Sequence, residues 1–380
     1  MLHIHSTNLQ RAVGGGEVYT RSFTRALADA GARVTLHVDP SNRFWDGLAG
    51  PSISLSPARN AAELLAALPT RDALILTQSA IPPEVLATAV ACHVLTGFAH
   101  MPMHERAPGE FLRYRLVLSV SRYCIGLLGR AGVGHVYPEP LYGTFALERP
   151  AAGEIVARST YHWDERKWRD RFLGILEPVA RAFRPARVFR RDAGLTLGIV
   201  SLLAPIKQFP LLFSHLAPII ARHPQVRLEV FGNGGYAQVR DLKRALVPLG
   251  ERVRWWGFQA SVQAIYPQLD YLMTGLPEKE ALGLNVLEAQ ACGTPVLAPN
   301  APPFTETIVD GQSGFLYRDP RQDHGADFAA LLERIVLGEP RPDPRAATAH
   351  LAQFSYAALV ERARRLLAHL AQAFPNAGRQ

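Results

Sequence analysis

Two glutamates, Glu280 and Glu288, lie eight residues apart, and a Gly-Leu pair between them opens an apolar helix. Eight residues are about two helical turns, or ~12 Å of rise. We therefore expect Glu280 in the loop before the helix and Glu288 two turns along it. The backbone N–H groups of Gly283, Leu284 and Asn285 would lie between the two carboxylates. These N–H groups have no partner inside a helix, and the helix dipole adds partial positive charge there.

A phosphate fits such a helix end, and Gly283 would let it approach the backbone closely. The two flanking carboxylates could accept hydrogen bonds from the hydroxyls of a sugar or a ribose. The pattern therefore predicts a site for a nucleotide sugar. The alternative is an ordinary amphipathic helix that carries two solvated glutamates.

The length and composition of the chain indicate which class of protein carries this predicted site. At 380 residues the chain is too long for one ordinary core, which predicts two domains. Its 48% hydrophobic and 19% charged residues are typical of a folded protein. The net charge of +8 permits contact with phosphates, nucleic acid or an anionic membrane but selects none of them.

Three well-separated cysteines, Cys92, Cys124 and Cys292, lack metal-type spacing and suit a reducing compartment. The N-terminus starts directly as a strand, without the layout of a signal peptide. No apolar run approaches the ~18 residues of a spanning helix. We expect a cytoplasmic, soluble protein, and we leave open peripheral attachment to the inner face of the membrane.

Short apolar strands alternate with helical stretches along both halves of the chain, which predicts α/β units with parallel sheets. The predicted strands of the first half are 1–6, 34–38, 73–77, 93–97, 116–120 and 135–137. Those of the second half are 195–201, 227–231, 253–256, 271–274, 295–298 and 314–317.

The tract Arg158–Asp192 separates the two halves and carries ten basic and five acidic residues. Within it an apolar stripe recurs at helical spacing: Trp168, Phe172, Ile175, Leu176, Val179 and Phe183. One interpretation is docking of Arg158–Arg191 on an anionic membrane surface. The other is a helix packed against the protein with solvated arginines. The tract contains no nucleic-acid-binding module, so we expect no nucleic-acid partner.

The signature around the two glutamates resembles a known family. The run from Glu280 to Glu288, with the small residues that follow it, resembles the E-x7-E motif of retaining glycosyltransferases of family 4, the group 1 glycosyl transferases. The continuation from Glu306 through Gly311 and Gly314 resembles the family's E-x-V-x-x-G-x-x-G segment.

The resemblance implies an α/β protein of GT-B architecture, in which two Rossmann-like domains with parallel sheets and flanking helices face each other across a cleft. The implied domains are 1–150 on the acceptor side, a basic and aromatic connector over 151–193, a nucleotide-sugar-binding domain over 194–353, and a helix over 354–380 that crosses back to the first domain.

The resemblance also implies roles for single residues. Glu280 would hold the hydroxyls of the transferred sugar as a catalytic residue, and Glu288 would hold the donor ribose. Lys207 matches the family lysine that contacts the donor diphosphate, together with the amides of Gly283, Leu284 and Asn285. The family arginine is replaced by Leu202, which predicts weaker donor binding unless another cation substitutes.

Three further positions match the family more loosely. Gly232 resembles the glycine turn after the second strand of the donor domain, and a plain tight turn is the alternative. Gly15 and Gly16 resemble the G-G-x-E loop that approaches the donor phosphate, but they could also be a flexible turn. His100 corresponds to a catalytic histidine near the transferred sugar, and a surface or core histidine is the alternative.

The implied activity is retaining transfer from a nucleotide-diphosphate-sugar donor to a hydroxyl of a glycan or a lipid-linked acceptor, in polysaccharide or glycoconjugate biosynthesis. No D-x-D motif or zinc-type spacing occurs, so we expect neither a metal nor another cofactor. The alternative function is a catalytically silent, sugar-nucleotide-binding partner protein, which the loss of the arginine at Leu202 would favour.

Overall fold

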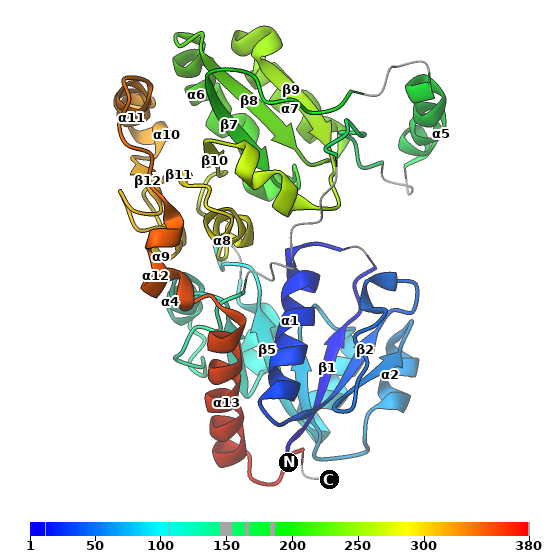
Figure 1. The fold of residues 1–380 in the computed structure, drawn as a ribbon. Coiled ribbons are helices and arrows are strands. Elements are labelled where there is room, and N and C mark those ends of the chain that lie inside the picture. Colours follow the sequence, from blue (N-terminus) through cyan, green and yellow to red (C-terminus); the bar gives the residue numbers. More distant parts are fainter. Residues whose placement is uncertain (12, 106, 145–153, 164–166, 183–186, 379–380) are drawn as a thin grey trace. The chain divides into compact units, whose positions relative to one another are not determined.

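The computed structural model describes the chain except residues 12, 106, 145–153, 164–166, 183–186 and 379–380 (Figure 1). It divides into two compact units: unit 1 comprises Met1–Ala146 and Ala352–Gln380, and unit 2 comprises Leu147–Leu351.

Unit 1 is built on a six-stranded parallel sheet in the order β3-β2-β1-β4-β5-β6. All four residues of β4, Leu-Ile-Leu-Thr, are buried, as expected for a strand that helices cover on both faces. The strands are β1 (His3–Asn8), β2 (Arg33–Val38), β3 (Ile53–Pro57), β4 (Leu74–Thr77), β5 (Val94–Ala99) and β6 (Leu116–Ser119).

Helices of unit 1 come from both ends of the chain, and α13 packs along α1 (Figure 1). The last described residues return to the start of the sheet, where His3 N donates to Gly378 O at 2.8 Å. The helices are α1 (Gly15–Asp29), α2 (Ala61–Ala67), α3 (Pro83–Cys92), α4 (Arg122–Arg130) and α13 (Tyr356–Ala373), with short 3-10 turns η1 (Arg43–Trp45) and η2 (Gly109–Arg113).

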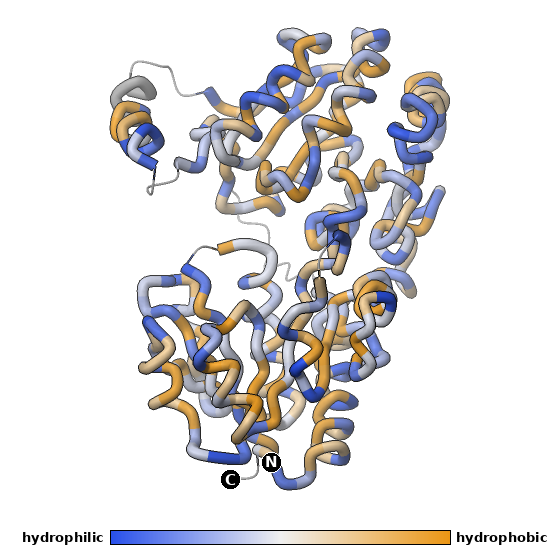
Figure 2. The backbone as a smooth tube through the Cα atoms, turned by 180° about the vertical axis from the view of Figure 1, so that it is seen from behind, coloured by the Kyte–Doolittle hydropathy of each residue, from blue (hydrophilic) through white to orange (hydrophobic). Residues whose placement is uncertain are grey.

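Unit 2 contains a second six-stranded parallel sheet, in the order β12-β11-β10-β7-β8-β9. Figure 2 shows the apolar residues concentrated in the strands of both sheets. The strands are β7 (Leu195–Val200), β8 (Val226–Phe231), β9 (Val253–Gly257), β10 (Tyr271–Met273), β11 (Val296–Pro299) and β12 (Gly314–Tyr317).

The connections of unit 2 are mostly helical, as parallel strands require. Its α-helices are α5 (Trp168–Ala182), α6 (Phe209–Ala221), α7 (Tyr236–Ala245), α8 (Leu284–Ala291), α9 (Phe304–Thr307), α10 (Pro320–Asp323) and α11 (Ala326–Val336), and α12 (Thr348–Ala352) lies at the unit boundary. The 3-10 turns are η3 (Pro205–Lys207), η4 (Val247–Arg252), η5 (Val262–Ala264), η6 (Tyr266–Gln268) and η7 (Pro344–Ala346).

In the first half one predicted strand is wrong and one strand of the structure was not predicted. The segment 135–137 forms only a single bridge, Val117 to Val136, and no strand. The edge strand β3 was not predicted, because its sequence Ile-Ser-Leu-Ser-Pro is short, ends in proline and has no fully buried residue.

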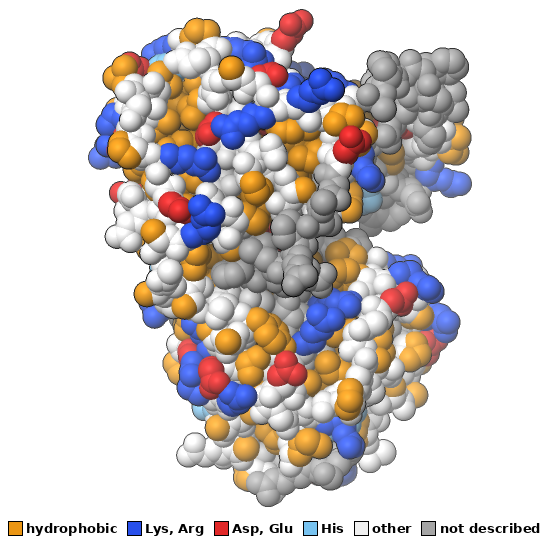
Figure 3. Space-filling view, viewed as in Figure 1, with side chains coloured by type: hydrophobic (Ala, Val, Ile, Leu, Met, Phe, Trp, Pro, Cys, Tyr) orange, Lys and Arg blue, Asp and Glu red, His pale blue; other side chains and the backbone are white. Residues whose placement is uncertain are grey.

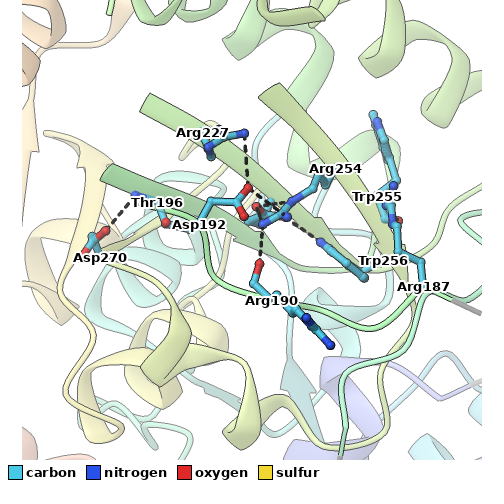
Figure 4. Close-up of polar contacts among 10 residues, drawn as sticks. Arg187, Arg190, Asp192, Thr196, Arg227, Arg254, Trp255, Trp256 and Asp270 are labelled. Carbon is cyan, nitrogen blue, oxygen red and sulfur yellow. Dashed lines mark hydrogen bonds and ion pairs between the residues drawn. The ribbon is translucent and has the colours of Figure 1, made fainter. Parts of the chain in front are cut away.

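A buried ion pair anchors the end of the connector to the sheet of unit 2 (Figure 4). Glu229 on β8 is fully buried; one carboxylate oxygen accepts from Arg254 Nε at 2.8 Å and the other from Trp256 Nε1 at 2.6 Å. Arg254 also pairs with Asp192 at 3.2 Å and donates to Arg190 O at 3.0 Å. The connector therefore ends in a fixed position beside β8 and β9.

Two buried histidines lie on neighbouring strands of unit 1. His5 Nδ1 and His37 Nε2 are 3.1 Å apart, and neither His5 Nε2 nor His37 Nδ1 has a hydrogen-bond partner among the described residues. Burial, with His3 close by, lowers the pKa of His5 to about 3 and that of His37 to about 4. Both rings are therefore neutral in the folded protein at pH 7.

We expect this pair to make unit 1 sensitive to acid. Below about pH 6.5 the unfolded chain binds protons that the folded chain does not, so stability falls as pH falls, by up to ~1.4 kcal/mol per pH unit for each histidine. Thermal unfolding between pH 7 and 5 should show a shallower pH slope for His5→Asn/His37→Asn than for the wild type. The partly exposed His104, changed to Asn, is the control. An unchanged slope in the double variant would contradict the assignment.

Candidate functional site

The residues predicted for a site fall into two groups, each at the carboxyl edge of one sheet. In unit 2, β7 lies between β8 and β10, so the chain leaves β7 and β10 towards opposite sides. In unit 1 the chain likewise leaves the neighbouring strands β1 and β4 towards opposite sides. Open parallel sheets bind ligands at such switch points. Lys207 follows β7 and Glu280 follows β10, whereas Gly15 follows β1.

Lys207 and Glu280 form an ion pair in unit 2 although they are 73 residues apart in sequence. Both side chains are mostly buried, with 20% and 14% of their surfaces exposed. Lys207 ends the 3-10 turn η3, and the chain then turns at Gln208 with a left-handed φ of 52°. The sequence-predicted catalytic carboxylate and the predicted diphosphate-binding lysine are thus in direct contact.

Helix α8 begins beside this pair, as the sequence predicts. Gly283 is its N-cap with a φ of 84°, and its N–H donates to Glu280 Oε1 at 3.2 Å. No acceptor is found for the backbone N–H groups of Leu284 and Asn285 within the part of the chain that the structure describes. The Asn285 side chain donates to Val200 O at 3.1 Å, which ties the helix start to the end of β7. The helix end thus offers donors to an anion next to Lys207.

Glu288 lies only about one turn along α8, because the helix begins at Leu284 and the expected two turns include the loop from Glu280. It is held by a tyrosine that the motif did not reveal. The Tyr266 hydroxyl donates to Glu288 Oε2 at 2.9 Å. Burial raises the pKa of Glu288, and the hydrogen bond from Tyr266 opposes this shift. Burial, with the nearby Glu288 carboxylate, raises the pKa of Tyr266 well above its ordinary value, so the phenol remains a donor. Tyr266 thus orients the Glu288 carboxylate, and no partner for its Oε1 is found among the described residues.

Two glycines let the loops of this edge pack closely. Gly232 has a φ of 133°, and a Cβ there would lie 1.8 Å from Ser201 O. A Cβ on Gly275 would lie 2.0 Å from Lys207 O, and the adjacent Leu276 N donates to that same oxygen at 3.2 Å. Gly232 is therefore required by packing, and Gly275 positions the turn that carries Lys207.

Leu202, where the family arginine is expected, is 49% exposed. Arg191 does not compensate for it, because its guanidinium bonds Asp270 at 2.7 Å. The other oxygen of Asp270 accepts from Thr196 N, at the start of β7 (Figure 4). That is the opposite edge of the sheet from Lys207. Arg321 on α10 does reach the loop after β10, where it pairs with Glu278.

The group in unit 1 surrounds the first turn of α1 and the end of β5. Gly15 is exposed, and a Cβ on Gly16 would meet nothing within 4 Å, so packing does not require a glycine at position 16. His100 Nε2 lies 2.9 Å from Gln78 Oε1, and its ring stacks on Phe98 with centroids 4.6 Å apart. The structure thus assigns His100 a fixed, half-buried place after β5.

Burial lowers the pKa of His100 to about 4, so the ring is neutral at pH 7. It can donate or accept a hydrogen bond but carries no charge for an anionic ligand. Its partner Gln78 is buried, and Gln78 Nε2 has no hydrogen-bond partner among the residues described. Gln78 follows β4 directly, and a polar residue after a buried strand was a signal that could have identified it.

The described residues contain no candidate metal site. Across the described residues, no group of three or more His, Cys, Asp or Glu side chains is arranged to hold a metal ion.

Comparisons with known proteins show which sequences and folds the chain resembles. Residues 194–336 match the family model of the group 1 glycosyl transferases. The D-inositol 3-phosphate glycosyltransferase of Stackebrandtia nassauensis is 32% identical over 181 residues, which are 43% of this chain and 39% of the relative. That of Mycolicibacterium smegmatis is 34% identical over 147 residues, 37% of this chain and 33% of the relative. The alignments thus span between a third and two fifths of these two curated relatives.

Solved structures resemble the whole chain in fold. Anabaena HepE in complex with UDP-glucose has a TM-score of 0.69 at 16% identity, covering 97% of this chain and 100% of HepE. Sucrose-phosphate synthase from Thermosynechococcus elongatus has a TM-score of 0.65 at 17% identity, covering 98% and 100%. The predicted fold class, two parallel-sheet domains of the GT-B type, is confirmed. The resemblance to group 1 glycosyl transferases is confirmed over residues 194–336.

Proposed function

We propose that this chain is a retaining glycosyltransferase that moves a sugar from a nucleotide-diphosphate sugar to a hydroxyl of a glycan or lipid-linked acceptor. The single observation that carries the proposal is the contact of Lys207 and Glu280 beside the start of α8. The site combines a cation, backbone donors and a carboxylate at the switch point between β7 and β10. That chemistry suits a diphosphate linked to a sugar.

The roles follow from the contacts of each group. Lys207 and the N–H groups of Leu284 and Asn285 would bind the diphosphate and stabilise the charge that develops on it as it leaves. Glu280 would accept hydrogen bonds from the sugar hydroxyls. Glu288, oriented by Tyr266, would accept from the ribose. Because these donors can neutralise the diphosphate, the proposal needs no metal.

The transfer would proceed at the front face of the sugar, through an oxocarbenium-like state, with the leaving phosphate taking the proton of the acceptor hydroxyl. The anomeric configuration is then retained. His100 in unit 1 would contribute a neutral hydrogen-bonding group to the sugar, and Gly15 and Gly16 would let a ligand approach the backbone. A role in polysaccharide or glycoconjugate assembly is part of the same proposal.

The test is product analysis with a panel of UDP-, GDP-, ADP- and TDP-sugars in the presence of EDTA. We expect nucleoside diphosphate release that depends on an added glycan or glycolipid acceptor. By NMR, the new linkage should have the same anomeric configuration as the donor. Inverted products would overturn the mechanism, and loss of all turnover in EDTA would overturn metal independence.

A silent donor-binding partner protein is the second candidate, and the exposed Leu202 favours it. Donor binding without turnover on any acceptor would support this alternative.

We expect Gly275→Ala to weaken donor binding about 10-fold or more, because its Cβ would displace the turn carrying Lys207 and one charge-assisted contact is worth ~1.5–3 kcal/mol. The Kd of the nucleoside diphosphate measures the effect. Gly235→Ala is the matched control, because a Cβ there would meet nothing within 4 Å and the φ is −61°. Equal Kd values for the two variants would contradict the role of Gly275.

A further inference from the structure

Helix α5 exposes its apolar side chains instead of burying them. Trp168, Phe172, Ile175 and Leu176 are 82%, 58%, 72% and 44% exposed. Their spacing of four, three and one residues places them on one helix face. Val179 and Phe183, predicted for the same stripe, lie outside the residues whose side chains are described. Four large exposed apolar groups on two turns form a patch of the kind that marks an interaction site.

The opposite face of α5 packs on unit 2, so the orientation of the stripe is fixed by contacts. The Trp163 indole donates to Glu177, and a Cβ on Gly174 would lie 3.3 Å from the same ring. Trp163 stacks on Tyr161 with centroids 4.9 Å apart. Asp170 is buried. The helix thus presents its carboxylates to the protein and its apolar face to the outside.

Basic side chains border the outward stripe. Lys167, Arg169 and Arg171 are exposed, and at 100° per residue Arg169 and Arg171 lie on opposite sides of it. The two acidic residues of α5 whose side chains are described are not exposed. Asp170 is buried, and Glu177 is half-buried against Trp163. In the upper right of Figure 3, a few hydrophobic and basic side chains are visible at the edge of the region of α5.

Several basic residues of the tract make contacts within the protein. Arg169 pairs with Asp170 at 3.4 Å and lies over the ring of Tyr236 on α7 at 4.6 Å. Arg187 stacks over Trp256 at 4.6 Å and donates to Trp255 O (Figure 4). Arg191 pairs with Asp270. Arg166 and Arg184 lie outside the described residues, and the side chain of Arg181 is not described. The basic residues of Arg158–Arg191 thus have two roles. Arg187 and Arg191 hold the end of the connector to the sheet, and Lys167 and Arg171 at the start of α5 carry exposed charge.

We propose that α5 docks on an anionic lipid bilayer, with Trp168, Phe172, Ile175 and Leu176 at the interface and Lys167 and Arg171 on the headgroups. We choose an anionic bilayer as the partner because its charge complements that of the basic residues. Each basic residue near an anionic surface strengthens the attraction, and an aromatic–aliphatic stripe partitions into the membrane interface. No helix among the described residues is long and apolar enough to span the bilayer, so this contact would lie in the plane of the surface. The proposal is independent of the glycosyltransferase activity.

Co-sedimentation with vesicles of equal phosphatidylglycerol and phosphatidylcholine, compared with pure phosphatidylcholine, tests it. We expect the wild type to bind the anionic vesicles, and Phe172→Ser/Ile175→Ser to bind at least about 10-fold more weakly. Lys167→Glu/Arg171→Glu should show a loss of similar size. Brominated anionic lipids should quench tryptophan fluorescence in the wild type but much less in Trp168→Phe.

Two controls separate specific docking from general attraction of a basic protein. Arg240→Glu/Arg244→Glu changes the charge by the same amount on α7, where both side chains are exposed, and should keep most of the binding. Val247→Ser removes a 70% exposed apolar group elsewhere in unit 2 and should have no effect. Equal loss from the α7 variant, no vesicle binding, or a wild-type dimer that Phe172→Ser/Ile175→Ser dissociates would each overturn the proposal.

Discussion

Glu280→Gln is expected to lower the rate of sugar transfer about 100-fold or more. The carboxylate contacts Lys207 and accepts from the N–H groups of Ala281 and Gly283, both at 3.2 Å. Glutamine has the same size but loses the charge, so the lysine loses its pair and the proposed contacts to the sugar weaken. Initial rates at saturating donor measure the loss, and a thermal melt checks that the fold is intact.

Glu333→Gln is the matched control, because this glutamate on α11 is 57% exposed and away from the carboxyl edge of the sheet. It should leave the rate unchanged. Transfer by Glu280→Gln within about threefold of the wild type would remove Glu280 from the proposed machinery.

Arg254→Met is expected to destabilise unit 2 by ~3–5 kcal/mol, because it leaves the buried carboxylate of Glu229 without its cation. Among the described residues, the indole of Trp256 would then be the one remaining side-chain partner of that carboxylate. The change would also remove one ion pair of Asp192 and the hydrogen bond to Arg190 O at the end of the connector (Figure 4). Urea or thermal unfolding of the purified protein measures the loss.

Arg227→Met is the control within the same cluster. Arg227 pairs with Asp192 at 3.3 Å, but both side chains are more than a third exposed, so the loss should be below ~1 kcal/mol. The double variant Arg254→Met/Glu229→Leu should regain much of the stability, because it removes the unpaired charge. Losses of equal size for Arg254→Met and Arg227→Met would contradict a buried ion pair.

The sequence predicted the local parts of this architecture well. Eleven of twelve predicted strands occur, because alternating apolar runs and helices determine parallel sheets locally. The start of α8 was also predictable, since a glycine directly precedes an apolar run and such a glycine is a good helix boundary. These features depend on residues close together in the chain.

Contacts between distant segments could not be predicted. The pairing of Lys207 with Glu280, and of Tyr266 with Glu288, depends on how β7, η6 and α8 pack. The role of Gly275 is visible only from the carbonyl of Lys207 that lies against it. Periodicity in α5 revealed an apolar stripe but not its direction. The contacts of Trp163 and Glu177 determine that direction, and they involve residues outside the stripe.

The measurement that tests the central claim most directly is calorimetric titration of UDP, GDP, ADP and TDP, in EDTA, into the wild type and Lys207→Met. Arg334→Met on α11, 59% exposed, is the matched charge control. We predict that one nucleoside diphosphate binds the wild type and the control alike, and that Lys207→Met weakens binding about 10–150-fold, as loss of one charge-assisted contact requires. No binding by any nucleotide, or equal binding by Lys207→Met, would contradict a donor site between β7 and β10.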